Sequence, residues 1–178
     1  AGEAAGGVPG ADRLGGNALA DTQVCGKIAG VSASEAAKAT EIKTNDEQVQ
    51  EEASRIESLI KKGSIKPQEF KENIKNLMWE KVAIVREEKT LNEALKELQK
   101  MQENLDKLDV GYKKQYNTEL MTALEVINMV EICILTVKSA ILRRESRGAH
   151  FRSDFPETID MWKRSIVINK EKIEFEAR

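Results

Sequence analysis

Apolar residues recur at helical spacing between residues 46 and 144, and this periodicity restricts the fold more than any other feature of the chain. It predicts helices at about Asp46–Lys62, Pro67–Val85, Thr90–Leu108 and Asn117–Arg144. The last three are long and are joined by short loops, so we expect a mainly α protein built on an antiparallel three-helix bundle. Charged residues make up 33% of the chain and aromatic residues 4%, which is typical of a helical protein with a solvated outer face.

Local signals predict where these helices begin and end. Gly63 suits a C-terminal cap, and Pro67 fits the first turn of the next helix. Thr90 and Glu93 form a capping-box pattern, which predicts a helix start at Thr90. The helix that follows has apolar residues in heptad spacing at Leu91, Leu95, Leu98, Met101, Leu105 and Leu108. An intermolecular coiled coil would use the same spacing, but six such positions are short for a free-standing coil, which favours the intramolecular bundle.

The first 16 residues have no helical or strand period and contain many glycines. A helix is expected to follow, capped by Asn17 or by Gly16 just before it. Gly26 and Gly30 lie four residues apart in this helix, and alanines continue the same spacing. Such a face lets a helix lie very close to a neighbouring backbone, and no other segment of the chain supplies that neighbour. We therefore expect a partner segment to be missing; the alternative is a small-residue helix packed on the bundle.

The end of the chain, from residue 148, changes character. Gly148 is expected to end the long helix, and the irregular segment after it holds the single histidine, His150. Alternating or apolar runs at Ser165–Ile168 and Lys172–Phe175 predict a short β-hairpin. Arg147 is expected to form an ion pair that fixes this irregular segment, and His150 is expected to have a structural role.

Composition excludes several classes of site. The net charge is −2, from 28 basic and 30 acidic residues, which provides no field for nucleic acid or an anionic membrane. Cys25 and Cys133 have no metal-ligand spacing, so no metal site is expected, while a single disulfide stays open.

The most apolar stretch, Leu120–Leu142, is interrupted by Glu125, Glu131 and Lys138, so we interpret it as a bundle helix and not as a transmembrane segment. The chain opens at Ala1 inside a loop that already looks functional. We expect it to be part of a larger protein.

Three segments in order resemble one family. They are AGEAAGGVPGADRLGGNALADTQVCGKIAG, LMWEKVAIVREEKTLNEAL, and ESRGAHFRSDFPE with MWKRSIVI after it. Together they resemble the C-terminal part of the flavoprotein subunit of succinate dehydrogenase and fumarate reductase, a superfamily that includes L-aspartate oxidase and the alpha subunit of adenylylsulfate reductase. The GNALADTQV run is most similar to soluble, archaeal-type fumarate reductases. The resemblance covers essentially the whole chain and implies FAD as the cofactor of the intact protein.

The resemblance also implies site residues. Glu3 matches the glutamate that hydrogen-bonds the FAD ribose, and Arg13 matches the arginine that binds a carboxylate of fumarate or succinate. Asn17, Ala18 and Leu19 match the residues whose backbone contacts the flavin ring. These roles are physically reasonable, because arginine offers a two-pronged donor to a carboxylate and a helix start offers free N–H groups with partial positive charge. Such a helix start would stabilise the anionic reduced flavin and raise its potential.

The chain departs from the family pattern at Pro9 and Asp12, where the family has histidine and asparagine. Asp12 places a negative charge beside Arg13 and is expected to weaken anion binding unless it points away. No strand–GxGxxG–helix fingerprint is present, and the family's proton-donating arginine and FAD-carrying histidine match no residue here. We therefore expect no complete catalytic set in this chain, which alone should be inactive.

The resemblance implies three parts: residues 1–44 as the remnant of an FAD-binding domain, 45–147 as the bundle, and 148–178 as a loop and hairpin tail. It implies an oxidoreductase acting on a C4 dicarboxylate by flavin hydride transfer. The implied partners are upstream flavin-binding and capping segments and an iron–sulfur subunit. The expected location is cytoplasmic, with a peripheral position at the inner face of the membrane as a variant. The alternatives are a non-catalytic docking or assembly module, or the same region of L-aspartate oxidase.

Overall fold

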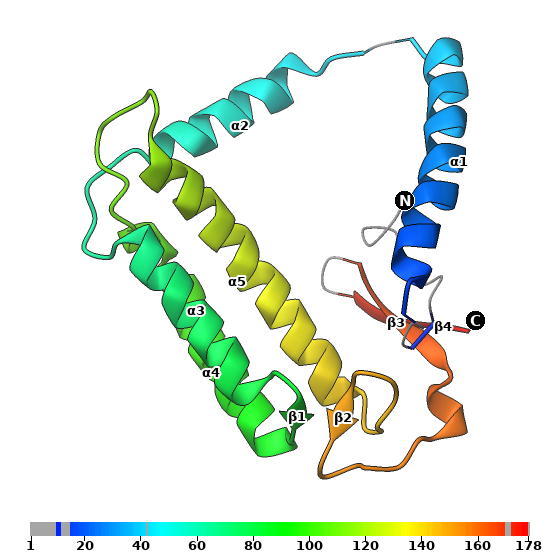
Figure 1. Cartoon of the computed structure of the whole chain (residues 1–178). Helices are drawn as coiled ribbons and strands as arrows, with labels where there is room; N and C mark the ends of the chain where they lie inside the picture. The colour runs from blue at the N-terminus through cyan, green and yellow to red at the C-terminus, as the bar shows by residue number, and fades with distance from the viewer. Residues whose placement is uncertain (1–9, 12–14, 42, 170–171, 178) are drawn as a thin grey trace. The chain divides into compact units, whose positions relative to one another are not determined.

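The computed structural model of the protein describes residues 10–11, 15–41, 43–169 and 172–177 (Figure 1). The chain divides into two compact units, residues 1–49 and residues 50–178. The expected domain limits after residues 44 and 147 stay predictions.

The first unit contains one long helix, α1 (Asn17–Ala39), as the sequence predicts. Gly16 caps its N-terminus with a left-handed backbone (φ 86°), which glycine adopts without steric cost. None of the residues of α1 is buried. Helix α2 (Asp46–Ser58) begins at the end of this unit, where the Asn45 side chain accepts hydrogen bonds from the backbone N–H groups of its first turn. The sequence predicted a longer α2, ending at Lys62.

The second unit is built on the predicted three-helix bundle of α3 (Pro67–Lys81), α4 (Glu88–Glu103) and α5 (Thr118–Leu142). Each of these helices packs against the other two, and the chain runs along them in alternating directions (Figure 1). Asn117 caps α5, because its Oδ1 accepts a hydrogen bond from the Leu120 N–H at 3.0 Å. The buried core comprises Phe70, Ile74, Leu77, Val82, Leu91, Ala94, Leu98, Leu108, Val110, Ala123, Val126, Val130, Ile134, Val137 and Ala140.

The heptad-spaced residues of α4 serve this core, so the intramolecular interpretation is confirmed. Leu91 and Leu98 are fully buried, and the residues between and after them are partly buried against the same cluster. The helix ends earlier than predicted, at Glu103, and a 3₁₀ turn at Leu105–Lys107 carries the last heptad positions.

The predicted start of α4 is wrong, because the cap comes from a distant residue. The helix begins at Glu88, and the Thr90 hydroxyl only donates to the Glu87 carbonyl within the first turn. The acceptor for the Glu88 N–H is Oδ2 of Asp154, at 2.8 Å. A carboxylate at a helix N-terminus is favourable electrostatically, so residue 154 does what the local pattern was expected to do.

Gly63 does not cap α2, which ends at Ser58. A Cβ atom at Gly63 would overlap the backbone of Lys107 and Leu108. The neighbouring N–H groups of Ser64 and Ile65 both donate to the Lys107 carbonyl, at 2.9 and 3.1 Å. Glycine is needed here for a close backbone approach at one end of the bundle.

Short strands complete the second unit. Strand β1 (Val85–Arg86), between α3 and α4, pairs in parallel with β2 (Phe151–Arg152). Strands β3 (Arg164–Asn169) and β4 (Lys172–Ala177) pair antiparallel, which confirms the predicted hairpin. Helix α5 ends at Leu142, before Gly148, which instead occupies a positive-φ turn (φ 55°) between Arg147 and His150.

Among the described helices, α5 alone is long and apolar enough to cross a membrane, judged by length and composition. Its buried residues, from Ala123 to Ala140, belong to the core shared with α3 and α4. This placement agrees with the expectation of a bundle helix.

Candidate functional site

The three residues expected to contact a flavin ring, Asn17, Ala18 and Leu19, form the first turn of α1. The Leu19 N–H already donates to the Gly16 carbonyl at 3.1 Å, as does the Ala20 N–H at 3.3 Å. Asn17 and Ala18 come before this first intrahelical bond, at positions where backbone N–H groups lack an intrahelical acceptor. The turn can therefore offer backbone donors and partial positive charge to an anionic or electron-rich edge.

The approach to this turn is open. A Cβ atom built at Gly15 or Gly16 would meet nothing within 4 Å, and the side chain of Leu19 is exposed. A planar ring could therefore lie against the glycine pair and the start of α1 without meeting a side chain of these residues. The residues that the structure describes here fit the flavin ring of FAD.

Glu3 and Arg13, expected to bind the FAD ribose and the substrate carboxylate, lie outside the described residues, as do Pro9 and Asp12. Their roles stay predictions, and so does the flavin contact of the α1 start.

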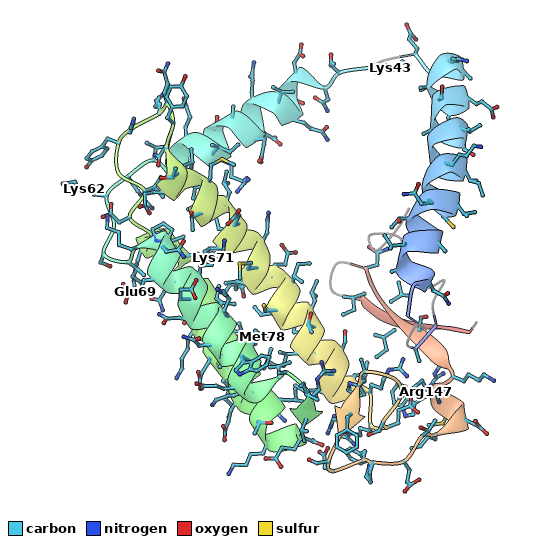
Figure 2. The ribbon with its side chains drawn as sticks, in the orientation of Figure 1. Lys43, Lys62, Glu69, Lys71, Met78 and Arg147 are labelled. Carbon is cyan, nitrogen blue, oxygen red and sulfur yellow. The ribbon has the colours of Figure 1, made fainter. Side chains whose placement is uncertain are left out.

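A second group of functional side chains lies at the end of the bundle, in the loop after α5, where Figure 2 shows Arg147. At its centre is Glu145, whose side chain is fully buried. It accepts hydrogen bonds from Arg143 at 2.7 Å and Arg147 at 2.9 Å, and from the backbone N–H of Ile159 at 2.9 Å. Burial raises the pKa of Glu145, but the donors outweigh it and lower the pKa to about 2. The expected ion pair of Arg147 is thus present.

Arg152 joins two helix ends. Its buried guanidinium donates to the carbonyls of Ala140 and Ile141 in the last turn of α5, at 2.8 and 3.3 Å, and pairs with Asp154 at 2.6 Å. Asp154 in turn caps α4. The arginine lowers the pKa of Asp154 to about 2. A cation at a helix C-terminus and an anion at a helix N-terminus both match the helix dipoles, so this pair ties α5 to α4.

His150 connects this loop to β1. Its Nε2 lies 3.0 Å from the Arg143 carbonyl, which can only accept, so Nε2 carries the proton. Its Nδ1 lies 2.8 Å from Nη1 of Arg86, which can only donate, so Nδ1 is unprotonated. Burial lowers the pKa of His150, and the charges of Arg86, Arg143 and Arg152 oppose protonation further. The imidazole is therefore neutral and structural, as expected, and it holds Arg86 in place.

Most members of this polar cluster were missed in the sequence. Arg86, Arg143, Glu145 and Asp154 had no assigned role, because ion pairs between residues of a loop and two helix ends follow no fixed spacing. The available signal was the density of charge in RESRGAHFRSDFP directly after an apolar helix. Charge in that position has to be paired or solvated, and here much of it is paired and buried.

Within the described residues, no group of three or more His, Cys, Asp or Glu side chains could hold a metal ion. Cys25 and Cys133 are both free thiols, and each is half-buried. Burial raises the pKa of Cys133, and a hydrogen bond with Asp21 is the main cause that raises the pKa of Cys25.

Comparison with known proteins places the second unit in a family. Residues 71–178 match the family model of the fumarate reductase flavoprotein C-terminal region. The chain is 45% identical over 170 residues to a protein of the fumarate reductase (CoM/CoB) of Methanothermobacter marburgensis, covering 96% of this chain and 31% of that protein. It is 35% identical over 157 residues to the fumarate reductase flavoprotein subunit of Helicobacter pylori strain 26695, covering 85% of this chain and 22% of that protein.

Solved structures share the fold. A quinol–fumarate reductase solved with menaquinol molecules superposes with a TM-score of 0.83 at 24% identity, covering 92% of this chain and 31% of that one. The adenylylsulfate reductase of Archaeoglobus fulgidus superposes with a TM-score of 0.61 at 24% identity, covering 78% of this chain and 25% of that one. The chain spans at most about a third of the length of these relatives. By its family match over more than half its length, the chain belongs to the family of fumarate reductase flavoprotein C-terminal regions.

Proposed function

We propose that this chain acts as the C-terminal portion of an FAD-dependent fumarate reductase or succinate dehydrogenase flavoprotein subunit. The observation that carries the proposal is the match to relatives named as fumarate reductase proteins, which extends over nearly the whole chain. The reaction would be an oxidoreduction of a C4 dicarboxylate. FAD, when bound, supplies hydride transfer at its flavin ring.

Within that reaction this chain contributes binding and orientation. Glu3 would hold the FAD ribose, and the first turn of α1 (Asn17, Ala18 and Leu19) would direct backbone N–H groups at the flavin. The positive end of α1 favours the anionic reduced ring, which raises the potential of the cofactor.

Arg13 would bind one carboxylate of the dicarboxylate through two parallel N–H···O hydrogen bonds, which fix the orientation of the substrate as well as its position. Asp12 beside it would oppose anion binding unless its side chain points away. The groups that move protons to the substrate would come from segments outside this chain.

The partners follow from the same proposal. Upstream flavin-binding and capping segments would cover α1, and an iron–sulfur subunit would exchange electrons with the flavin. The chain would be cytoplasmic, with a peripheral position at the inner membrane face as a variant. The small-residue face of α1 supports a covering segment, because none of the residues of α1 is buried and Val24, Ile28 and Val31 are exposed.

The same region of L-aspartate oxidase is an alternative of the same chemical type. A non-catalytic docking or assembly module is a second candidate. It is favoured by one observation: the core of the bundle is complete without α1. A module of that kind would need neither FAD nor Arg13.

Arg13→Ala in the intact protein tests the proposal. We expect FAD to stay bound, with its absorbance unchanged after desalting, while fumarate reduction falls at least about a hundredfold through the lost bidentate contact. The matched control is Arg55→Ala, on the exposed face of α2, which should leave both unchanged. Unaltered turnover of the Arg13 variant would remove the substrate role, and an intact protein that binds no FAD would favour the docking module.

A further inference from the structure

A pocket of about 620 Å³ opens in the second unit between the C-terminal half of α5, strand β3 and the loop that holds His150. Its volume is in the range of small-molecule sites. None of the residues assigned to flavin or dicarboxylate binding lines it. Its polar end is formed by Arg86, Arg143 and His150, and its apolar wall by Ile132, Leu135 and Ile166.

The charges around the polar end do not balance. Arg143 and Arg147 share Glu145, and Arg152 pairs with Asp154. Arg86 is half-buried, and no carboxylate among the described residues forms an ion pair with it. Burial lowers the pKa of Arg86, and repulsion by Arg152 lowers it further. A cation that is half-desolvated and next to another cation gains from an anion placed against it.

Arg86 is also held in a fixed position. Its Nε donates to the Val82 carbonyl at 2.7 Å, and its Nη1 donates to Nδ1 of His150 at 2.8 Å. A guanidinium has five N–H groups, so these two bonds leave further donors on the same rigid plane. His150, fixed by its own bond to the Arg143 carbonyl, acts as a positioning residue for Arg86. Pre-organised donors of this kind lose little entropy when a carboxylate binds.

We propose that this pocket binds a small monoanionic carboxylate with an apolar chain or ring, with the carboxylate on Arg86 and the apolar part along Ile132, Leu135 and Ile166. One unpaired cation matches one negative charge, which disfavours a phosphate dianion in a half-buried setting. The apolar wall gives nothing to a carboxylate without an apolar part. It favours molecules that carry both.

Octanoate is a suitable probe, with three compounds that each lack one feature. Titration calorimetry on the intact protein should show saturable octanoate binding. Acetate lacks the chain and 1-octanol lacks the charge, and each should bind at least about tenfold more weakly. Inorganic phosphate should bind more weakly than octanoate. Equal binding of 1-octanol would reduce the pocket to an apolar groove, tighter binding of phosphate would contradict the monoanion, and no octanoate binding would overturn the proposal outright.

Two variants locate the site. Arg86→Gln should weaken octanoate about tenfold or more, towards the level of 1-octanol, while Arg55→Gln removes the same charge on α2 and should change nothing. Because Arg86→Gln could disturb the fold, Thr136→Glu provides a second test at another residue that lines the same pocket. Its carboxylate should occupy the site and block octanoate.

Unchanged octanoate binding in either pocket variant would refute the assignment. FAD content and fumarate reduction are measured in the same samples, so failure of this site is distinguishable from failure of the proposed flavoprotein function.

Discussion

Helix α1 and the loop after α5 place their side chains against expectation in opposite directions. In α1 the apolar residues Val24, Ile28 and Val31 are exposed, and no residue is buried. In the loop after α5 the charged residues Glu145 and Arg152 are fully buried. Burial in this protein is therefore decided by the partners available and not by the polarity of the residue. The loop contains its partners, whereas α1 depends on its intrinsic helix propensity, which is marginal for an isolated helix.

The largest effect is expected at Glu145. Glu145→Gln removes the buried charge that Arg143 and Arg147 share, so two arginines lose their carboxylate at once. Breaking a buried pair by removing one partner costs about 3–5 kcal/mol of unfolding free energy. Urea denaturation followed by circular dichroism measures this cost.

The matched control is Glu52→Gln, which removes one partner of the exposed ion pair with Arg55 on α2. Exposed pairs contribute at most about 1 kcal/mol, so the midpoint should barely move. If the two variants lose the same stability, the buried network is not what holds the loop in place.

A pair of leucines separates the bundle from α1. Leu98 is fully buried between the helices, while 73% of Leu19 is exposed. Leu98→Ala is expected to cost about 2–5 kcal/mol, through lost burial and the cavity left behind. Leu19→Ala should change stability by less than about 0.5 kcal/mol. A large loss for the Leu19 variant in thermal unfolding would mean that α1 packs on something within this chain.

The bundle was predictable because its signal is local and repeated. Apolar residues such as Leu91, Leu98 and Ile134 recur at helical spacing, and each is buried as expected. The boundaries were less predictable, because α4 is capped by Asp154, 66 residues away, and Gly63 is fixed by a backbone contact with Lys107. Neither contact has a local pattern.

The candidate sites divide in the same way. The start of α1 could be identified, because the glycine pair at Gly15 and Gly16 and the motif around it carry a resemblance. The pocket at Arg86 could not be found from the sequence, because Arg86 and His150 are 64 residues apart and meet only through the parallel pairing of β1 with β2. Nothing in either segment alone predicts that pairing.

Two glycines test the comparison with effects of opposite sign. Gly63→Ala introduces a Cβ into the backbone of Lys107 and Leu108 and should cost about 1–3 kcal/mol. Gly26→Ala, in the middle of α1, meets nothing within 4 Å and should stabilise the helix by about 0.5–1 kcal/mol. Helix content and melting temperature of the 178-residue chain report both. A destabilising Gly26 variant would show that the small-residue face of α1 is already in contact.

The smallest effect is expected from the titration of His150. Burial and the charges of Arg86, Arg143 and Arg152 lower its pKa in the folded protein below the ordinary value of 6.5. At a pH between these two values the unfolded chain binds more protons than the folded one, so stability rises with pH through that window. The neutral imidazole thus contributes fully above about pH 6.5, and its contribution falls as the pH drops towards the folded pKa.

His150→Asn keeps an acceptor for Arg86 but does not titrate. Urea midpoints measured from about pH 5 to about pH 8 should therefore show a step in the wild-type protein that this variant lacks. A step of the same size in both would assign the pH dependence to carboxylates elsewhere and leave Arg86 without its pH-sensitive support.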